Sequence, residues 1–188
     1  MDRLEMFSLK GKTALVTGGA GLYGQQIVLA LAEAGAKTYV ASRNLKVLEE
    51  LVGEDRTRGL DVTALQYDQA EEGSIQGMVG PDPFIYRGTE MSGWYPDYFF
   101  HKGGMINFTR FIASYYEMKN VRCNCISPGG FRTEKMPEAF VRQYSEKTFL
   151  GRLAGGTDLM GIIIFLASDA SAYITGTNIP VDGGYTAK

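Results

Sequence analysis

A tyrosine and a lysine stand four residues apart at Tyr98 and Lys102. On a helix this spacing brings both side chains to the same face. A phenol with a pKa of about 10 is a weak acid–base group at neutral pH, but a nearby ammonium group stabilises the phenolate and lowers that pKa. The pair could exchange a proton with a substrate oxygen while the lysine holds a cofactor ribose. Tyr115 and Lys119 repeat the spacing, so the spacing alone does not select the reactive pair.

A glycine-rich segment near the N-terminus has the Gly-x-Gly-x-x-Gly pattern of dinucleotide-binding turns. Glycine permits a positive φ, a close approach of backbone N–H groups to a pyrophosphate and tight packing of a helix on a strand. A glycine-rich turn without a ligand is the alternative, and a Walker-type phosphate loop is excluded because no Gly-Lys-Ser/Thr closes the turn. The residues expected to contact the cofactor are Gly18, Gly19, Gly21, Leu22 and Gly24.

Ser42 and Arg43 follow the second predicted strand, at the place where a carboxylate would bind the adenosine ribose of NAD. No carboxylate is present, and Arg43 could pair with a 2′-phosphate instead. The pattern therefore favours NADP(H) over NAD(H). The alternative is that Arg43 is a solvated charge that precedes a helix.

Strands and helices are expected to alternate in the first third of the chain, which predicts a parallel α/β sheet with right-handed crossovers. Residues 69–96 contain many glycines and prolines, and no regular element is predicted there. The predicted strands are 12–17, 37–41, 61–67, 121–126 and 178–181, and the predicted helices are 25–34, 44–52, 97–118, 137–148 and 158–167.

The composition of the 188 residues is that of one globular domain, residues 1–188, with 45% hydrophobic and 21% charged residues. A net charge of −2 favours neither a nucleic-acid partner nor a membrane surface, and no apolar run reaches the length of a membrane span. Two cysteines offer no disulfide framework, so we expect a cytoplasmic protein, and we expect no metal site.

The chain resembles the short-chain dehydrogenase/reductase family over nearly all of its length except residues 69–96. The resemblance implies a Rossmann-like, doubly wound parallel sheet in three α/β/α layers. The segments that carry it are Thr17–Gly24, the helix that begins Tyr-Phe-Phe-His-Lys at Tyr98, the segment Asn120–Gly130, and the tail Phe165–Asp169, Ile174–Gly176 and Val181–Gly184.

In that family a Tyr-x-x-x-Lys pair opens the helix that precedes the Val-Arg-x-Asn strand. The resemblance therefore selects Tyr98 and Lys102, and leaves Tyr115 and Lys119 as a surface pair. It implies an NAD(P)-dependent oxidoreductase that interconverts a small-molecule carbonyl and alcohol, assembled as a dimer or homotetramer. It also implies a substrate-orienting serine at Ser74, an adenine contact at Asp68 and nicotinamide contacts at Pro128, Gly129 and Thr133.

Two departures from the family pattern concern the middle of the chain. Tyr98 lies 24 residues after Ser74, so an inserted loop at residues 81–95, together with residues 134–150, is expected to border the substrate. The Asn-Asn-Ala-Gly strand and the helix after it are absent, which amounts to about 50–60 residues. The central strands of the sheet therefore have no counterpart in this sequence.

Because this strand and helix are absent, two hypotheses about the function stay open. One is an active oxidoreductase, and the other is a dinucleotide-binding protein without turnover, a remnant of a reductase. We expect a break in the chain between Glu72 and Gly73, with their Cα atoms much farther apart than 3.8 Å. A continuous chain would instead hold Ser74 within roughly 20 Å of Asp68, which would either exclude Ser74 from the catalytic cluster or pull the third strand inward.

Overall fold

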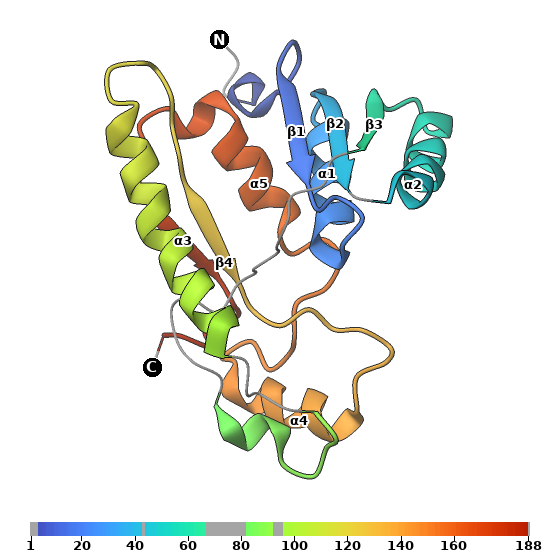
Figure 1. The fold of residues 1–188 in the computed structure, drawn as a ribbon, viewed down its shortest axis with the longest axis vertical. Coiled ribbons are helices and arrows are strands. Elements are labelled where there is room, and N and C mark those ends of the chain that lie inside the picture. The colour runs from blue at the N-terminus through green and yellow to red at the C-terminus, as the bar shows by residue number, and fades with distance from the viewer. Residues whose placement is uncertain (1–3, 43, 67–81, 92–95, 188) are drawn as a thin grey trace. The chain divides into compact units, whose positions relative to one another are not determined.

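The computed structural model describes residues 4–42, 44–66, 82–91 and 96–187 (Figure 1). The chain divides into two compact units. The first contains residues 1–72 and 156–172, and the second contains residues 73–155 and 173–188. The Glu72–Gly73 junction lies outside the described residues, and so do Arg43, Asp68 and Ser74.

The first unit is built on a parallel three-stranded sheet of β1 (Thr13–Thr17), β2 (Lys37–Ser42) and β3 (Val62–Gln66), in that order. Helix α1 (Leu22–Glu33) connects β1 to β2, and α2 (Leu45–Thr57) connects β2 to β3 (Figure 1). These elements confirm the strand–helix alternation that the sequence predicts, since each parallel pair needs such a crossover.

The core of this unit lies between the helices and one face of the sheet. Val16 of β1 and Val40 of β2 are paired in register, so their side chains lie on the same face, and both are buried. Leu15 lies on the opposite face and is 64% exposed. The buried apolar residues of this core are Leu9, Val16, Val28, Leu31, Ala32, Ala36, Val40, Leu48, Val52 and Val62.

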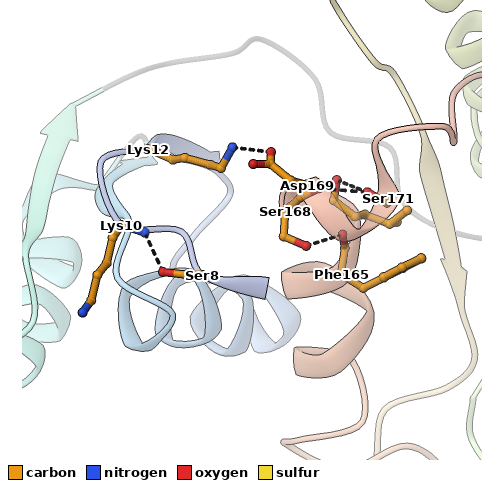
Figure 2. A network of polar contacts seen from close by, with 8 residues as sticks. Ser8, Lys10, Lys12, Phe165, Ser168, Asp169 and Ser171 are labelled. Atoms are coloured by element: carbon orange, nitrogen blue, oxygen red, sulfur yellow. Dashed lines mark hydrogen bonds and ion pairs between the residues drawn. The ribbon is translucent and has the colours of Figure 1, made fainter. Parts of the chain in front are cut away.

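Helix α5 (Met160–Ala167) returns to this unit from the far end of the sequence and packs beside α1. Its C-terminal turn is held by side-chain hydrogen bonds. Ser168 Oγ donates to the Phe165 carbonyl at 2.9 Å, and Lys12 Nζ forms an ion pair with Asp169 Oδ1 at 2.7 Å (Figure 2). The pair joins the start of β1 to the short 3-10 turn η3 (Asp169–Ser171).

The second unit contains a parallel pair of short strands, β4 (Cys125–Pro128) and β5 (Asn178–Val181). Helix α3 (Pro96–Tyr115) precedes β4 and contacts it. Helix α4 (Glu138–Lys147) packs against the 3-10 turn η2 (Pro83–Tyr86). A smaller core gathers there, formed by Ile85, Phe140, Val141, Tyr144 and Leu153.

Several predicted boundaries are wrong. Helix α1 begins at Leu22 instead of residue 25, and α2 continues to Thr57 instead of ending at residue 52. The strand expected at 121–126 is β4, which begins only at Cys125; just before it, the Asn124 side chain donates to the Ile174 carbonyl at 2.9 Å. The helix expected to reach residue 118 ends at Tyr115. Met118 has a φ of 61°, a left-handed conformation that no α-helix continues through.

In the part of the chain that the structure describes, the strands form two separate sheets, β1-β2-β3 in the first unit and β4-β5 in the second. Within the same residues, no helix combines the length and the apolar character that crossing a bilayer requires.

Candidate active site

The glycine turn joins β1 to α1 in the conformation that its sequence predicts. Gly18 has a φ of 66°, which a residue with a Cβ rarely adopts, and its N–H donates to the Ala41 carbonyl at 3.0 Å. The Gly21 N–H donates to the Gly18 carbonyl at 2.9 Å and closes the turn. Gly21 is the N-cap of α1, and no side chain caps the helix there.

Two further glycines allow helix and strand to approach closely. A Cβ at Gly24 would lie 2.8 Å from the Gly19 Cα and still closer to the Gly18 carbonyl oxygen. A Cβ at Gly19 would collide with Val40 on β2. The backbone of α1 thus lies directly on the turn, and this close packing is what the third glycine of the dinucleotide pattern provides. Leu22, the first residue of α1, exposes its side chain.

The end of β2 provides the second part of the candidate cofactor site. Ser42 is the last residue of the strand and is partly buried. The next helix, α2, is capped by Asn44, whose Oδ1 accepts from the Val47 N–H at 3.3 Å. The two residues between the end of β2 and the start of α2 are an arginine and an asparagine, so the sequence places no carboxylate there.

The Tyr98–Lys102 pair lies on α3, with Tyr98 in the first turn of the helix. Lys102 is only 8% exposed, and lysine is among the residues least often buried in proteins. The alternative pair has a different setting. Tyr115 is the last residue of α3, and Lys119 lies beyond the helix; both are exposed, which confirms the surface assignment.

The Pro128–Thr133 segment leaves β4 and is fixed from two sides. The Gly129 N–H donates to the Val181 carbonyl at 3.0 Å, and a Cβ at Gly129 would lie 3.0 Å from the Asp182 Cα. Pro128 is buried, and Thr133 is partly buried with its carbonyl accepting from the Met136 N–H at 3.2 Å. The segment is thus a short loop held at both ends.

The two segments that the sequence predicts as substrate walls contact each other within the second unit. Tyr86 of η2 and Phe140 of α4 place their ring centroids 5.6 Å apart. Lys147 Nζ forms an ion pair with Asp82 Oδ2 at 2.8 Å, and Gln143 Nε2 donates to the Arg87 carbonyl at 3.0 Å. Helix α4 and the segment around η2 therefore form one packed body.

The expected site residues fall into two groups. Gly18, Gly19, Gly21, Leu22, Gly24 and Ser42 belong to the first unit, where the turn and the end of β2 lie together. Lys102, Pro128, Gly129 and Thr133 belong to the second unit. In the part of the chain that the structure describes, no His, Cys, Asp and Glu side chains gather in a group that could hold a metal ion.

Two polar side chains beside the Pro128–Thr133 loop were not predicted. Tyr144 Oη accepts from the Gly130 N–H at 2.6 Å. Asp182 accepts from the Gly184 N–H at 2.9 Å and from the Thr186 hydroxyl at 2.6 Å, and so closes the turn after β5. Asp182 belongs to the Val-Asp-Gly-Gly motif of the sequence, whereas no pattern singles out Tyr144.

Comparisons with known proteins agree with this arrangement. Residues 85–186 match the family model described as enoyl-(acyl carrier protein) reductase, and residues 12–81 match the model described as short chain dehydrogenase. An oxidoreductase of Thermotoga maritima is 28% identical, with 96% of this chain and 98% of that protein covered.

Solved structures show the same fold. A gluconate 5-dehydrogenase from Burkholderia cenocepacia, solved with NADP and tartrate, superposes with a TM-score of 0.82 at 23% identity, covering 98% of this chain and 99% of that one. A short-chain type dehydrogenase/reductase from Mycobacterium marinum gives a TM-score of 0.81 at 24% identity, with the same coverage.

The Thermotoga alignment also measures what this chain lacks. It spans 250 positions and takes in 96% of 188 residues, which is about 180, so about 70 positions have no residue of this chain. Because the alignment covers 98% of the relative, the gap is internal. Its size is close to that of the strand–helix–strand segment that the sequence lacks. With both family models matched along the chain and the glycine turn formed as the family requires, the protein belongs to the short-chain dehydrogenase/reductase family of NAD(P)-dependent oxidoreductases.

Proposed function

We propose that this protein interconverts a small-molecule carbonyl and alcohol, with Tyr98 exchanging the proton at the substrate oxygen. The observation that carries the proposal is the burial of Lys102, one helical turn after Tyr98 on α3. Taking an ammonium group out of water is costly, so the burial of Lys102 indicates a side chain that is held in place on this face of α3 and is not freely solvated. Beside a phenol the ammonium group stabilises the phenolate, which makes Tyr98 a competent acid–base group near neutral pH.

The glycine turn supports the cofactor part of the proposal. Gly19 and Gly24 allow the close packing of α1 on the turn that dinucleotide-binding turns share, and the N-terminal end of the α1 dipole favours a pyrophosphate. A bound nicotinamide would supply or accept the hydride. On the protein side, Lys102 would hold the ribose, and Pro128, Gly129 and Thr133 would orient the carboxamide. Ser74 would orient the substrate carbonyl, and Asp68 would contact the adenine.

NADP(H) is the dinucleotide that we propose, because β2 ends at Ser42, Arg43 follows in the sequence, and no carboxylate stands there to repel a 2′-phosphate. We expect NADPH to bind more tightly than NADH, and Arg43→Ala to remove most of that difference. Equal affinity of the wild-type protein for the two cofactors would contradict the preference.

One dinucleotide-binding domain of residues 1–188 is part of the proposal. The family motifs that bind one cofactor are divided between the two units, with the glycine turn in the first and Lys102 in the second. We therefore expect one cofactor per chain and a single cooperative unfolding transition, and two independent transitions would contradict this.

A second copy of the chain is the expected macromolecular partner. Phe100, Phe108 and Phe111 lie on one face of α3, and each exposes its ring to solvent, with Phe100 80% exposed. Exposed aromatic side chains on one helix face are typical of an interaction surface. We expect a dimer or tetramer by light scattering and expect Phe108→Glu to shift it towards monomer.

A screen of aldehydes and ketones with NADPH tests the catalytic proposal. Turnover should be lost in Tyr98→Phe and in Lys102→Met. It should persist in Tyr115→Phe and Lys119→Met, which repeat the same changes at the exposed pair. Retained turnover in Tyr98→Phe would refute the role of that tyrosine.

The second candidate function is dinucleotide binding without turnover, which the internal gap of about 70 alignment positions favours. The two functions separate in one pair of measurements. Tight NADPH binding together with no turnover on any carbonyl would support the binding protein, whereas turnover that depends on Tyr98 would support the enzyme.

A further inference from the structure

The loop that leaves β4 is held by a side chain that the family resemblance does not assign. In addition to the Gly129 contact with β5, the Gly130 carbonyl accepts from the Ala154 N–H at 2.8 Å, and the Arg132 N–H donates to the Ala154 carbonyl at 3.0 Å. These backbone bonds leave the N–H of Gly130 to be satisfied. Tyr144 satisfies it, with its Oη 2.6 Å from the Gly130 nitrogen.

The ring of Tyr144 lies directly against the loop. A Cβ at Gly130 would stand 2.9 Å from Tyr144 Cζ, closer than real Cβ contacts, so only glycine at 130 lets the phenol reach the backbone. The hydroxyl therefore meets the loop from the side, at the second residue after Pro128. Contact and hydrogen bond together fix where the loop backbone runs.

Packing on α4 prevents Tyr144 from moving away. Its ring stacks on Tyr185 with centroids 5.1 Å apart, and it contacts Phe140 at 5.8 Å. Tyr144 is 8% exposed. Burial raises the pKa of its phenol to about 12, although the Gly130 N–H acts in the opposite direction, so the hydroxyl stays neutral in the physiological range. A phenol of this kind accepts a hydrogen bond and does not act as the proton carrier.

We propose that Tyr144 is a positioning residue for the nicotinamide side of the cofactor site: it fixes the Gly130 N–H and thereby the path of the Pro128–Thr133 loop. This inference rests on the proposed function, in which that loop orients the nicotinamide carboxamide. It extends the site to α4. This helix is expected to border the substrate, and the hydrogen bond joins it to the loop that is expected to hold the nicotinamide ring. A shift of α4 would then reach the nicotinamide through one hydrogen bond.

The test compares Tyr144→Phe with Tyr185→Phe. Both variants remove one hydroxyl from the same aromatic stack, but the Tyr185 hydroxyl bonds the backbone of Asp82 instead of the loop. Hydrogen exchange of the amides at residues 129–133 is measured first, because it needs no cofactor. We expect exchange to be about tenfold faster in Tyr144→Phe, the effect of losing about one hydrogen bond, and unchanged in Tyr185→Phe.

Binding of two probes is then measured for each variant. NADPH carries the nicotinamide, and 2′-phospho-ADP-ribose lacks it. Tyr144→Phe should weaken NADPH by about tenfold and leave 2′-phospho-ADP-ribose unchanged, whereas a general loss of structure would weaken both. Unchanged exchange, or equal weakening of both probes, would overturn the inference. If the wild-type protein bound neither probe, the proposed function would fail, while the exchange result would still decide whether Tyr144 holds the loop.

Discussion

Replacing Gly24 with alanine should destabilise the first unit, although alanine is normally the better helix former. Gly24 lies in the first turn of α1, and its missing Cβ leaves room for the backbone of the glycine turn. The added methyl would stand 2.8 Å from the Gly19 Cα and 2.9 Å from the Gly19 carbonyl carbon. Because these are backbone atoms, they cannot rotate aside as the end of a flexible side chain would.

The expected magnitude follows from two opposing effects. Alanine gains about 1 kcal/mol over glycine in a helix. Overpacking of this kind costs roughly 1–3 kcal/mol, and a clash with backbone belongs at the upper end or beyond. We therefore expect a net loss of about 2 kcal/mol in the free energy of unfolding.

Gly53→Ala provides the matched control. Gly53 lies inside α2, is exposed, and a Cβ there would meet nothing within 4 Å. Only the helix-propensity effect remains, so this variant should gain about 0.5–1 kcal/mol. Urea unfolding followed by circular dichroism measures both variants. If Gly24→Ala proved as stable as wild type, or within about 1 kcal/mol of Gly53→Ala, the close packing of α1 on the turn would be refuted.

Two further predictions concern pH. Burial raises the pKa of the Asp55 carboxyl above its usual value despite the Arg58 guanidinium 3.9 Å away, so its contribution to stability is complete below the unfolded pKa and is lost as pH rises through the folded pKa. Asp55→Asn should therefore raise the urea midpoint at pH 7, and the gain should shrink towards pH 4; a gain that does not change with pH would contradict this. Burial alone would raise the pKa of Asp182, but hydrogen bonds from the Thr186 hydroxyl and from the Gly184 and Thr186 N–H groups lower it overall. Its stabilisation is thus present above the unfolded pKa and is lost as pH falls through the folded pKa, so Asp182→Asn should lower the urea midpoint at pH 7 and approach wild type in acid, and a variant as stable as wild type at pH 7 would contradict this.

Much of the first unit could be predicted because its signals are local. Strand β1, the glycine turn and α1 follow from residue types within a few positions of one another, and Gly18 has the positive φ that its place in the turn requires. The region before β4 involves distant partners that no local pattern reveals. There the Asn124 side chain bonds to the Ile174 carbonyl, fifty residues away in the sequence.

The candidate site divides in the same way. The burial of Lys102 agrees with the helix and the spacing that selected it, and the exposure of Tyr115 agrees with its rejection. Tyr144 could not be predicted, since its contact with Gly130 depends on the packing of α4 and not on a sequence motif. Ser74, Asp68 and Arg43 stay predictions, and the Arg43→Ala variant tests the last of them.

Calorimetric titration of the wild-type chain with NADPH and NADH tests the central claim most directly. The claim is that the glycine turn binds a nicotinamide dinucleotide in a chain that lacks about 70 positions of its relatives. We predict saturable binding of one NADPH per chain, with NADH binding more weakly. Heats of dilution alone for both cofactors would contradict the claim.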